Sequence, residues 1–142
     1  MGIAVFENYE TIKLRGATRN VEYLGTFVAW LVINRLLDAR LERSAGSAVV
    51  RVRMQELTGS AFLATVLHGE LAASHINEAG RSFVERYFVT GRYRDDFAAR
   101  RYHGDDEWIL YDEMAPRITA AFRKHEATIT RRTAKIIRFP GR

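Results

Sequence analysis

The chain has 142 residues, of which 47% are hydrophobic and 27% charged, and it contains no cysteine. This length is typical of one domain that folds without a covalent cross-link. Because cysteine is absent, the composition excludes disulfides, thiolate metal sites and thiol nucleophiles. The longest apolar run, residues 27–33, is far too short to cross a bilayer, and the first residues do not resemble a secretory signal. We therefore expect a cytoplasmic protein without a membrane span.

The formal net charge of +5 is unevenly distributed along the chain. Residues 117–142 contain eight of the 22 Lys and Arg residues but only one of the 17 Asp and Glu residues, a net of +7. Residues 1–116 therefore carry a net of −2. A basic end on a nearly neutral body indicates one local binding feature rather than a general affinity for polyanions.

The first strong pattern predicts a helix over residues 21–43, with Asn20 as its N-cap. Around residues 27–33 this helix is apolar on all sides, which is typical of a central helix covered by its neighbours. Residues 48–54 alternate as a half-buried strand does but fit a short helix equally well, and both alternatives stay open. Thr58 then predicts the N-cap of another short helix.

The clearest amphipathic pattern follows, and it predicts a helix capped by Ser74 and stopped by Gly91. A short helix is expected over residues 93–99. The last predicted helix begins at the acidic residues 105–107, whose charges suit a helix N-terminus. Pro116 lies inside its apolar pattern, so either two helices meet there or one helix is kinked.

These patterns predict a mainly α, single-domain helical bundle of about five to six helices. Its core is expected over about residues 20–129, followed by a basic extension over about residues 130–142. Residues 3–6 and 134–139 have strand-like composition. Short strands that pair the two termini are therefore an alternative to unstructured ends.

No group of residues has the spacing of a catalytic, cofactor or metal site. His68 with Glu70, and His75 with Glu78, could each form an acid–base pair, but both histidines lie where polar rings cap helix ends. His125 falls on the apolar side of the last helix and is expected to be half-buried. No glycine-rich phosphate loop or nucleophile motif is present. We therefore predict no catalytic residues, no cofactor and no metal.

The basic end supplies the candidate partner-binding residues, Arg131, Arg132, Lys135 and Arg138. These side chains could bind an acidic protein partner, the phosphates of a nucleic acid or an anionic membrane surface. They could equally be solvated, or fold back on acidic residues of the body. No zinc finger, recognition helix or RNA-binding signature accompanies them.

Three stretches of sequence resemble an uncharacterised family of small helical bacterial proteins. They are GTFVAW (residues 25–30) with Asn34, NEAGRSFVERYF with GRYRDDF (residues 77–97), and Trp108, Tyr111–Asp112 and Pro116. The resemblance covers about residues 20–125, while the first 20 residues and the tail from about Thr128 depart from it. It implies a helical fold without an assigned activity.

Proteins of that kind are similar to the stand-alone immunity proteins found beside bacterial toxins. Their aromatic positions suit a helical core, with Asn77, Arg81 and Asp96 as candidate polar partners for buried Trp and Tyr side chains. We therefore expect a non-enzymatic protein-binding domain that acts as an immunity-type inhibitor of a bacterial toxin. Because the basic end would bind it, the toxin is expected to have an acidic surface. The alternative is a nucleic-acid-binding protein that acts through the basic tail.

Overall fold

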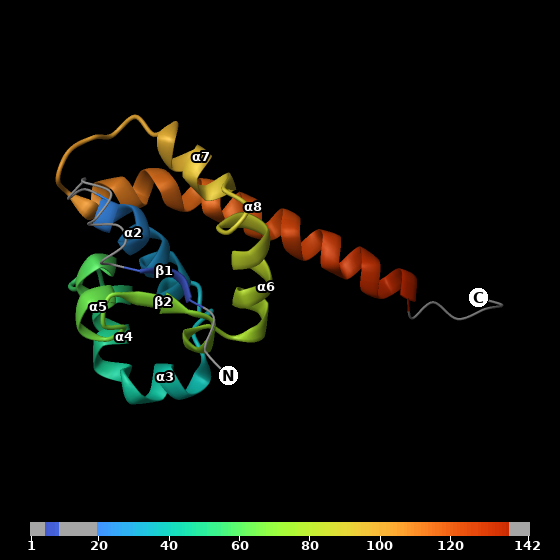
Figure 1. Ribbon diagram of the computed structural model, residues 1–142, viewed down its shortest axis with the longest axis horizontal. Coiled ribbons are helices and arrows are strands. Elements are labelled where there is room, and N and C mark those ends of the chain that lie inside the picture. The colour runs from blue at the N-terminus through green and yellow to red at the C-terminus, as the bar shows by residue number, and fades with distance from the viewer. Residues whose placement is uncertain (1–4, 9–19, 137–142) are drawn as a thin grey trace.

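The computed structural model of the protein describes residues 5–8 and 20–136. Over these residues the chain forms one mainly α-helical domain, which confirms the predicted fold class (Figure 1). The elements in chain order are β1 (Val5–Asn8), α2 (Asn20–Ile33), α3 (Ala39–Ser44), α4 (Gly46–Arg53), α5 (Gly59–Thr65), β2 (Glu70–Ala72), the 3-10 helix η1 (Ala73–His75), α6 (Glu78–Tyr87), α7 (Arg92–Ala98) and α8 (Glu107–Ile136). No helix among the described residues has the length and apolarity needed to span a membrane.

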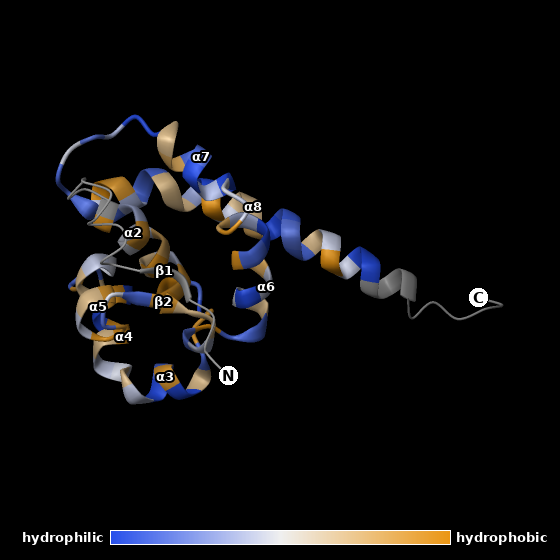
Figure 2. Cartoon of the chain, viewed as in Figure 1, coloured by the Kyte–Doolittle hydropathy of each residue, from blue (hydrophilic) through white to orange (hydrophobic). Residues whose placement is uncertain are grey.

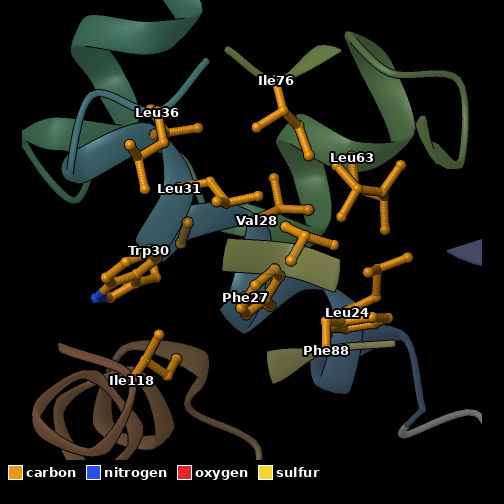
Figure 3. Packing of buried hydrophobic residues seen from close by; sticks show 14 of the residues in the cluster. Leu24, Phe27, Val28, Trp30, Leu31, Leu36, Leu63, Ile76, Phe88 and Ile118 are labelled. Carbon is orange, nitrogen blue, oxygen red and sulfur yellow. The ribbon is translucent and has the colours of Figure 1, made fainter. Parts of the chain in front are cut away.

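Helix α2 is the centre of the core, as its all-round apolar sequence predicts. Leu24 and every residue from Phe27 to Val32 are completely buried. Figure 3 shows the side chains of α2 reaching outward to Leu63 of α5 on one side and to Ile118 of α8 on another. The helix is covered in this way because α5, α6, α7 and α8 each contribute apolar side chains to the same cluster.

Helices α2 and α5 approach each other closely at two glycines. A Cβ atom at Gly25 would lie 2.6 Å from the backbone nitrogen of Ser60 and 2.8 Å from its Cα atom. A Cβ atom at Gly59 would clash with the carbonyl oxygen of Gly25. Only glycine lets the two backbones meet at this distance. The Ser60 N–H donates to a carboxylate oxygen of Glu107 at 2.9 Å, which connects this contact to the start of α8.

The prediction of one helix over residues 21–43 is wrong in its second half, because α2 ends at Ile33 and a non-helical turn follows. The Asn34 side-chain amide donates to the Trp30 carbonyl, and Arg35 adopts a left-handed conformation with φ of 60°. Leu37 then forms a β-bridge with Ile76. Asp38 starts α3 by accepting from the Arg40 N–H. The apolar pattern runs through the break because Leu36 and Leu37 remain buried without being helical.

Other predicted boundaries are confirmed or corrected by the caps. Residues 48–54 are helical, not a strand, and belong mostly to α4. Thr58 caps α5 as predicted, since its hydroxyl accepts from the Ala61 N–H at 3.1 Å. Ser74 does not cap α6; it lies in η1, and Asn77 is the cap, accepting from the Gly80 N–H at 2.8 Å. Sequence patterns find such helices but place their ends only approximately.

The alternative in which the two termini pair as strands is not found among the described residues. Strand β1 pairs antiparallel with β2, with Val5 opposite Ala72 and Asn8 opposite Glu70. Residues 134–136, which were expected to be strand-like, are the last residues of α8. Residues 3–4 and 137–139 lie outside the described part of the chain.

Helix α8 is one continuous helix that passes through Pro116. Of the two alternatives at this proline, the junction of two helices is therefore excluded. The Asp106 carboxylate begins the helix by accepting from the N–H groups of Trp108 and Ile109. Figure 1 shows α8 crossing the body beside α2 and α6 and then running well beyond it. Residues 129–132, beyond the body, are exposed to solvent.

Candidate functional site

A groove lies between α6, α7 and α8, with a volume of about 530 Å³. Phe83 and Tyr87 of α6 form its floor, and their rings stack with centroids 5.1 Å apart. Three exposed cations from three different helices, Arg86, Arg92 and Lys124, line its edge. The groove thus combines an aromatic base with a mostly basic rim.

Asp96 lines the groove, and both its carboxylate and its backbone carbonyl accept a hydrogen bond from a neighbouring side chain. The Tyr87 hydroxyl donates to Asp96 Oδ2 at 2.5 Å, and Arg117 of α8 donates to the Asp96 carbonyl oxygen at 2.9 Å. Burial, and then the hydrogen bond to Asp96, raise the pKa of Tyr87 far above its ordinary value. Tyr87 therefore remains protonated, and this network fixes α7 against α6 and α8.

His125 closes the groove where α8 leaves the body, and it is half-buried as predicted. Its Nε2 atom lies 3.1 Å from the Ser82 hydroxyl, and its ring lies 5.9 Å from that of Phe83. Burial, followed by the positive charge of Arg86, lowers the pKa of His125. This hydroxyl–imidazole pair connects α6 to α8.

Beyond the groove, the same face of α8 continues into solvent. Residues 121, 124–125, 128 and 131–132 follow at intervals of three or four and so lie on one face of the helix. We call residues 126–136 the projecting segment. Figure 2 shows both hydrophilic and apolar positions along the coloured part of this segment, up to the turns drawn in grey. Arg131 and Arg132 are exposed there, and they extend the basic rim away from the body.

Three of the four predicted partner-binding residues lie on α8. Arg131 and Arg132 are exposed on the helix, and Lys135 lies in its last turn. Arg138 lies outside the described residues. The sequence did not reveal that Arg86 and Arg92 face the same groove as Lys124. Only the packing of α6 and α7 against α8 brings those three cations together.

The histidine–carboxylate pairs considered from the sequence do not line the groove. The His75 ring accepts from the Ala72 N–H at 3.0 Å, so it acts as a cap. Burial lowers the pKa of His75; the negative charge of Glu70 opposes this shift, and the positive charge of His68 adds to it. Glu78 is exposed at the start of α6. Among residues 5–8 and 20–136 there is no cluster of three potential metal ligands.

The residues that carried the family resemblance have structural roles. Asp96 is the polar partner of a buried tyrosine, as predicted, but the indole of Trp30 donates to Thr119 instead. The Asn77 side chain donates to the Arg35 carbonyl in the turn after α2, and Arg81 donates to the Ile76 carbonyl before α6 at 2.7 Å. These contacts fix turns and helix packing, so they account for a shared fold.

A comparison with protein-family models supports the same view of the chain. The model described as a domain of unknown function, DUF7832, matches residues 8–112. The chain belongs to the DUF7832 family. No curated protein and no solved structure matches it. The DUF7832 match includes Arg86 and Arg92 but ends in the second turn of α8, so Lys124 and the projecting segment lie beyond the matched region.

Glu113 fixes the loop that joins α7 to α8. Its carboxylate accepts from the backbone N–H groups of Arg101 at 2.6 Å and Tyr102 at 2.8 Å. These two hydrogen bonds hold the pKa of Glu113 below its ordinary value. The ionised carboxylate therefore stabilises the loop.

A Glu113→Gln variant is expected to be less stable than the wild type by about 1 kcal/mol at neutral pH. Because the folded-state pKa is depressed, this difference is fully present above the ordinary value of 4.5 and is lost as pH falls through the folded-state pKa. Urea denaturation of both proteins across that range measures it. Asp112→Asn, at an exposed neighbouring carboxylate, is the control. A difference that stays constant as the pH falls would contradict this role for Glu113.

Proposed function

We propose that the protein is a non-enzymatic binding protein that engages an acidic surface of a protein partner. The supporting observation is the continuous basic face formed by the groove rim and the projecting segment. Arg86, Arg92 and Lys124 border the groove, and Arg131 and Arg132 follow on α8. Such a face attracts and orients an acidic partner, mainly by raising the association rate and excluding basic surfaces.

A protein partner fits the groove better than a nucleic acid does. Asp95 and Asp96 both line the groove, and their negative charges would oppose a phosphate backbone placed there. A protein surface can present carboxylates to the cations and a hydrogen-bond donor to Asp95. The aromatic floor and the half-buried His125 also favour a partner that brings apolar side chains.

Within this class, we propose an immunity-type role, in which the partner is a bacterial toxin whose activity the protein blocks. The sequence resemblance favours this role, and an inhibitor needs a binding surface but no active site. The test is co-expression with the product of the adjacent gene. We expect that product to reduce growth when expressed alone, to be tolerated when this protein is present, and to co-purify with it. Toxicity that is unchanged by this protein would contradict the proposal.

Charge reversal on α8 tests the proposed surface. An Arg131→Glu/Arg132→Glu variant is expected to bind the co-purifying partner at least about tenfold more weakly, because two attractive charges become repulsive. The matched control is Arg40→Glu/Arg43→Glu, two exposed arginines on α3, which lies on the side of the body away from α8 (Figure 1). Calorimetric titration of the purified partner measures the dissociation constants.

The same variants separate the two candidate functions. If the wild type retards DNA or RNA in a gel, with binding that weakens steeply as salt rises, and the α8 variant does not, the nucleic-acid function replaces the protein-binding one. Equal partner binding by both charge-reversed variants would instead contradict the assignment of this surface.

A further inference from the structure

A shallow hollow lies on the side of α8 that faces solvent, and we call it the α8 hollow. Ala121, which lines the groove, follows Asp112 of the hollow by nine residues and so lies about 180° around the helix from it. The hollow can therefore be occupied while the groove is free, and a role for it does not rest on the proposed function. Its volume is about 550 Å³, and its lining residues all belong to α8: Asp112, Ala115, Pro116, Thr119, Ala120 and Arg123.

Opposite charges lie at the two ends of the α8 hollow. Arg123 follows Asp112 by three helical turns, so the two side chains are about 20° apart around the helix and about 16 Å apart along it. Both residues are exposed. Within the part of the chain that the structure describes, the Asp112 carboxylate and the Arg123 guanidinium make no ion pair or hydrogen bond. Both charges are therefore available to another molecule.

The side chains between these two charges are short and uncharged. The other lining residues of the hollow are two alanines, a proline and a threonine, so a second helix can approach α8 closely there. The same face of α8 continues beyond each charge with an exposed apolar residue. Ile109, which is 48% exposed, lies before Asp112, and Ala127 follows Arg123. The face thus has the same kinds of side chain at both ends and opposite charges between them.

We infer that this face of α8 binds the same face of a second copy of the chain, with the two helices antiparallel. A twofold axis at the level between residues 117 and 118 relates the two copies. It places Asp112 of each copy opposite Arg123 of the other, so two identical ion pairs form across the short side chains of the hollow. It also places Ile109 of each copy beside Ala127 of the other, which covers both apolar side chains.

Charge complementarity selects the antiparallel arrangement. A parallel pair would place Asp112 beside Asp112 and Arg123 beside Arg123, and both contacts would be repulsive. The net charge of +5 on each chain opposes association at long range, but salt at about 0.15 M screens that repulsion. Because the contact consists of one helix pair, we expect weak association, with a dissociation constant on the order of 100 μM.

Single charge reversals test the two ion pairs in sedimentation-equilibrium experiments on the full chain. Asp112→Arg is expected to weaken self-association at least about tenfold, because the new arginine of each copy would lie opposite Arg123 of the other. Arg123→Asp is expected to do the same, since it sets two carboxylates opposite each other. The matched controls are Glu56→Arg and Arg43→Asp, which reverse exposed charges outside α8 and should leave self-association unchanged.

An equimolar mixture of the two single variants tests the arrangement itself. In a mixed pair, the arginine at position 112 of one copy lies opposite the aspartate at position 123 of the other, and Arg123 lies opposite Asp112. Both contacts are again attractive, so we expect the mixture to associate about as strongly as the wild type. The double variant Asp112→Arg/Arg123→Asp should also self-associate. Circular dichroism of each variant checks that α8 remains folded.

Three results would overturn the inference. One is a wild-type chain that stays monomeric up to about 1 mM, ten times the expected dissociation constant. Another is self-association that the controls weaken as much as the α8 variants do, or that the mixture fails to recover. The third is a monomeric wild type whose binding of the co-purifying partner is weakened by Asp112→Arg, which would make that partner the occupant of this face. If the wild type is monomeric and charge reversal at Arg131 and Arg132 still weakens partner binding, the inference fails and the proposed function stands.

Discussion

Replacing Gly25 by alanine is expected to lower the free energy of unfolding by about 3 kcal/mol. The added Cβ atom would meet the backbone of Ser60, at 2.6 Å from its nitrogen and 2.8 Å from its Cα atom. Backbone atoms cannot move aside as the end of a flexible side chain can. Helix α5 would have to shift away from α2, and the buried contacts between Leu24, Val28 and Leu63 would be loosened. Chemical denaturation followed by circular dichroism measures the change.

Gly46→Ala is the matched control for this experiment. Gly46 is the first residue of α4, and a Cβ atom there would have no neighbouring atom within 4 Å. Alanine at this helical position is expected to be neutral or to stabilise the protein by less than about 1 kcal/mol. If Gly25→Ala and Gly46→Ala had similar stabilities, the close approach of α2 and α5 would be contradicted.

Replacing Trp30 by alanine is expected to cost about 4 kcal/mol, a large part of the stability of a domain of this size. Trp30 is completely buried, and its ring lies between Phe83 of α6 and Phe122 of α8 at centroid distances of 5.3 and 5.4 Å. Its removal leaves a cavity where three helices meet. The variant should unfold at much lower urea concentration than the wild type, or not fold at all.

Two further variants show what the Trp30 indole contributes: one removes its hydrogen-bond acceptor, and the other removes the second tryptophan for comparison. Thr119→Val removes the acceptor 3.0 Å from the indole nitrogen and is expected to cost about 1 kcal/mol. Trp108→Ala removes a half-buried indole that packs on Tyr111, and should cost clearly less than Trp30→Ala. Equal losses from the two tryptophans would show that Trp30 is not the central contact between α2 and α8.

The residues shared with the resembling family explain the fold rather than the binding surface. Gly25 permits helix contact, Asn77 caps α6, and Asp96 satisfies Tyr87. The DUF7832 match covers these positions and ends at residue 112. We therefore expect members of the family to share the folded body. The projecting segment lies outside the matched region and carries cations on which the proposed partner specificity depends.

Local sequence patterns predicted the secondary structure correctly where one physical effect dominated. The apolar stretch around Phe27 predicted the buried central helix, and Thr58 predicted a cap that the structure confirms. They failed where two effects competed. Leu36 and Leu37 kept the apolar pattern of a helix, yet the turn at Asn34 and Arg35 ends it, and the β-bridge from Leu37 to Ile76 replaces helical hydrogen bonds. Periodicity records burial and does not record which backbone partner is used.

The basic end of the chain shows the same difference between what the sequence determines and what the tertiary structure decides. The sequence by itself determined that residues 117–142 are strongly basic and that cysteine chemistry is excluded, and its apolar patterns predicted one mainly α-helical domain. Only the tertiary structure decided that Arg131 and Arg132 lie on the end of the core helix α8, in line with a groove that also contains Arg86 and Arg92. Residues about 40 positions apart become neighbours only when α6 and α7 pack on α8, because that packing depends on the whole buried core.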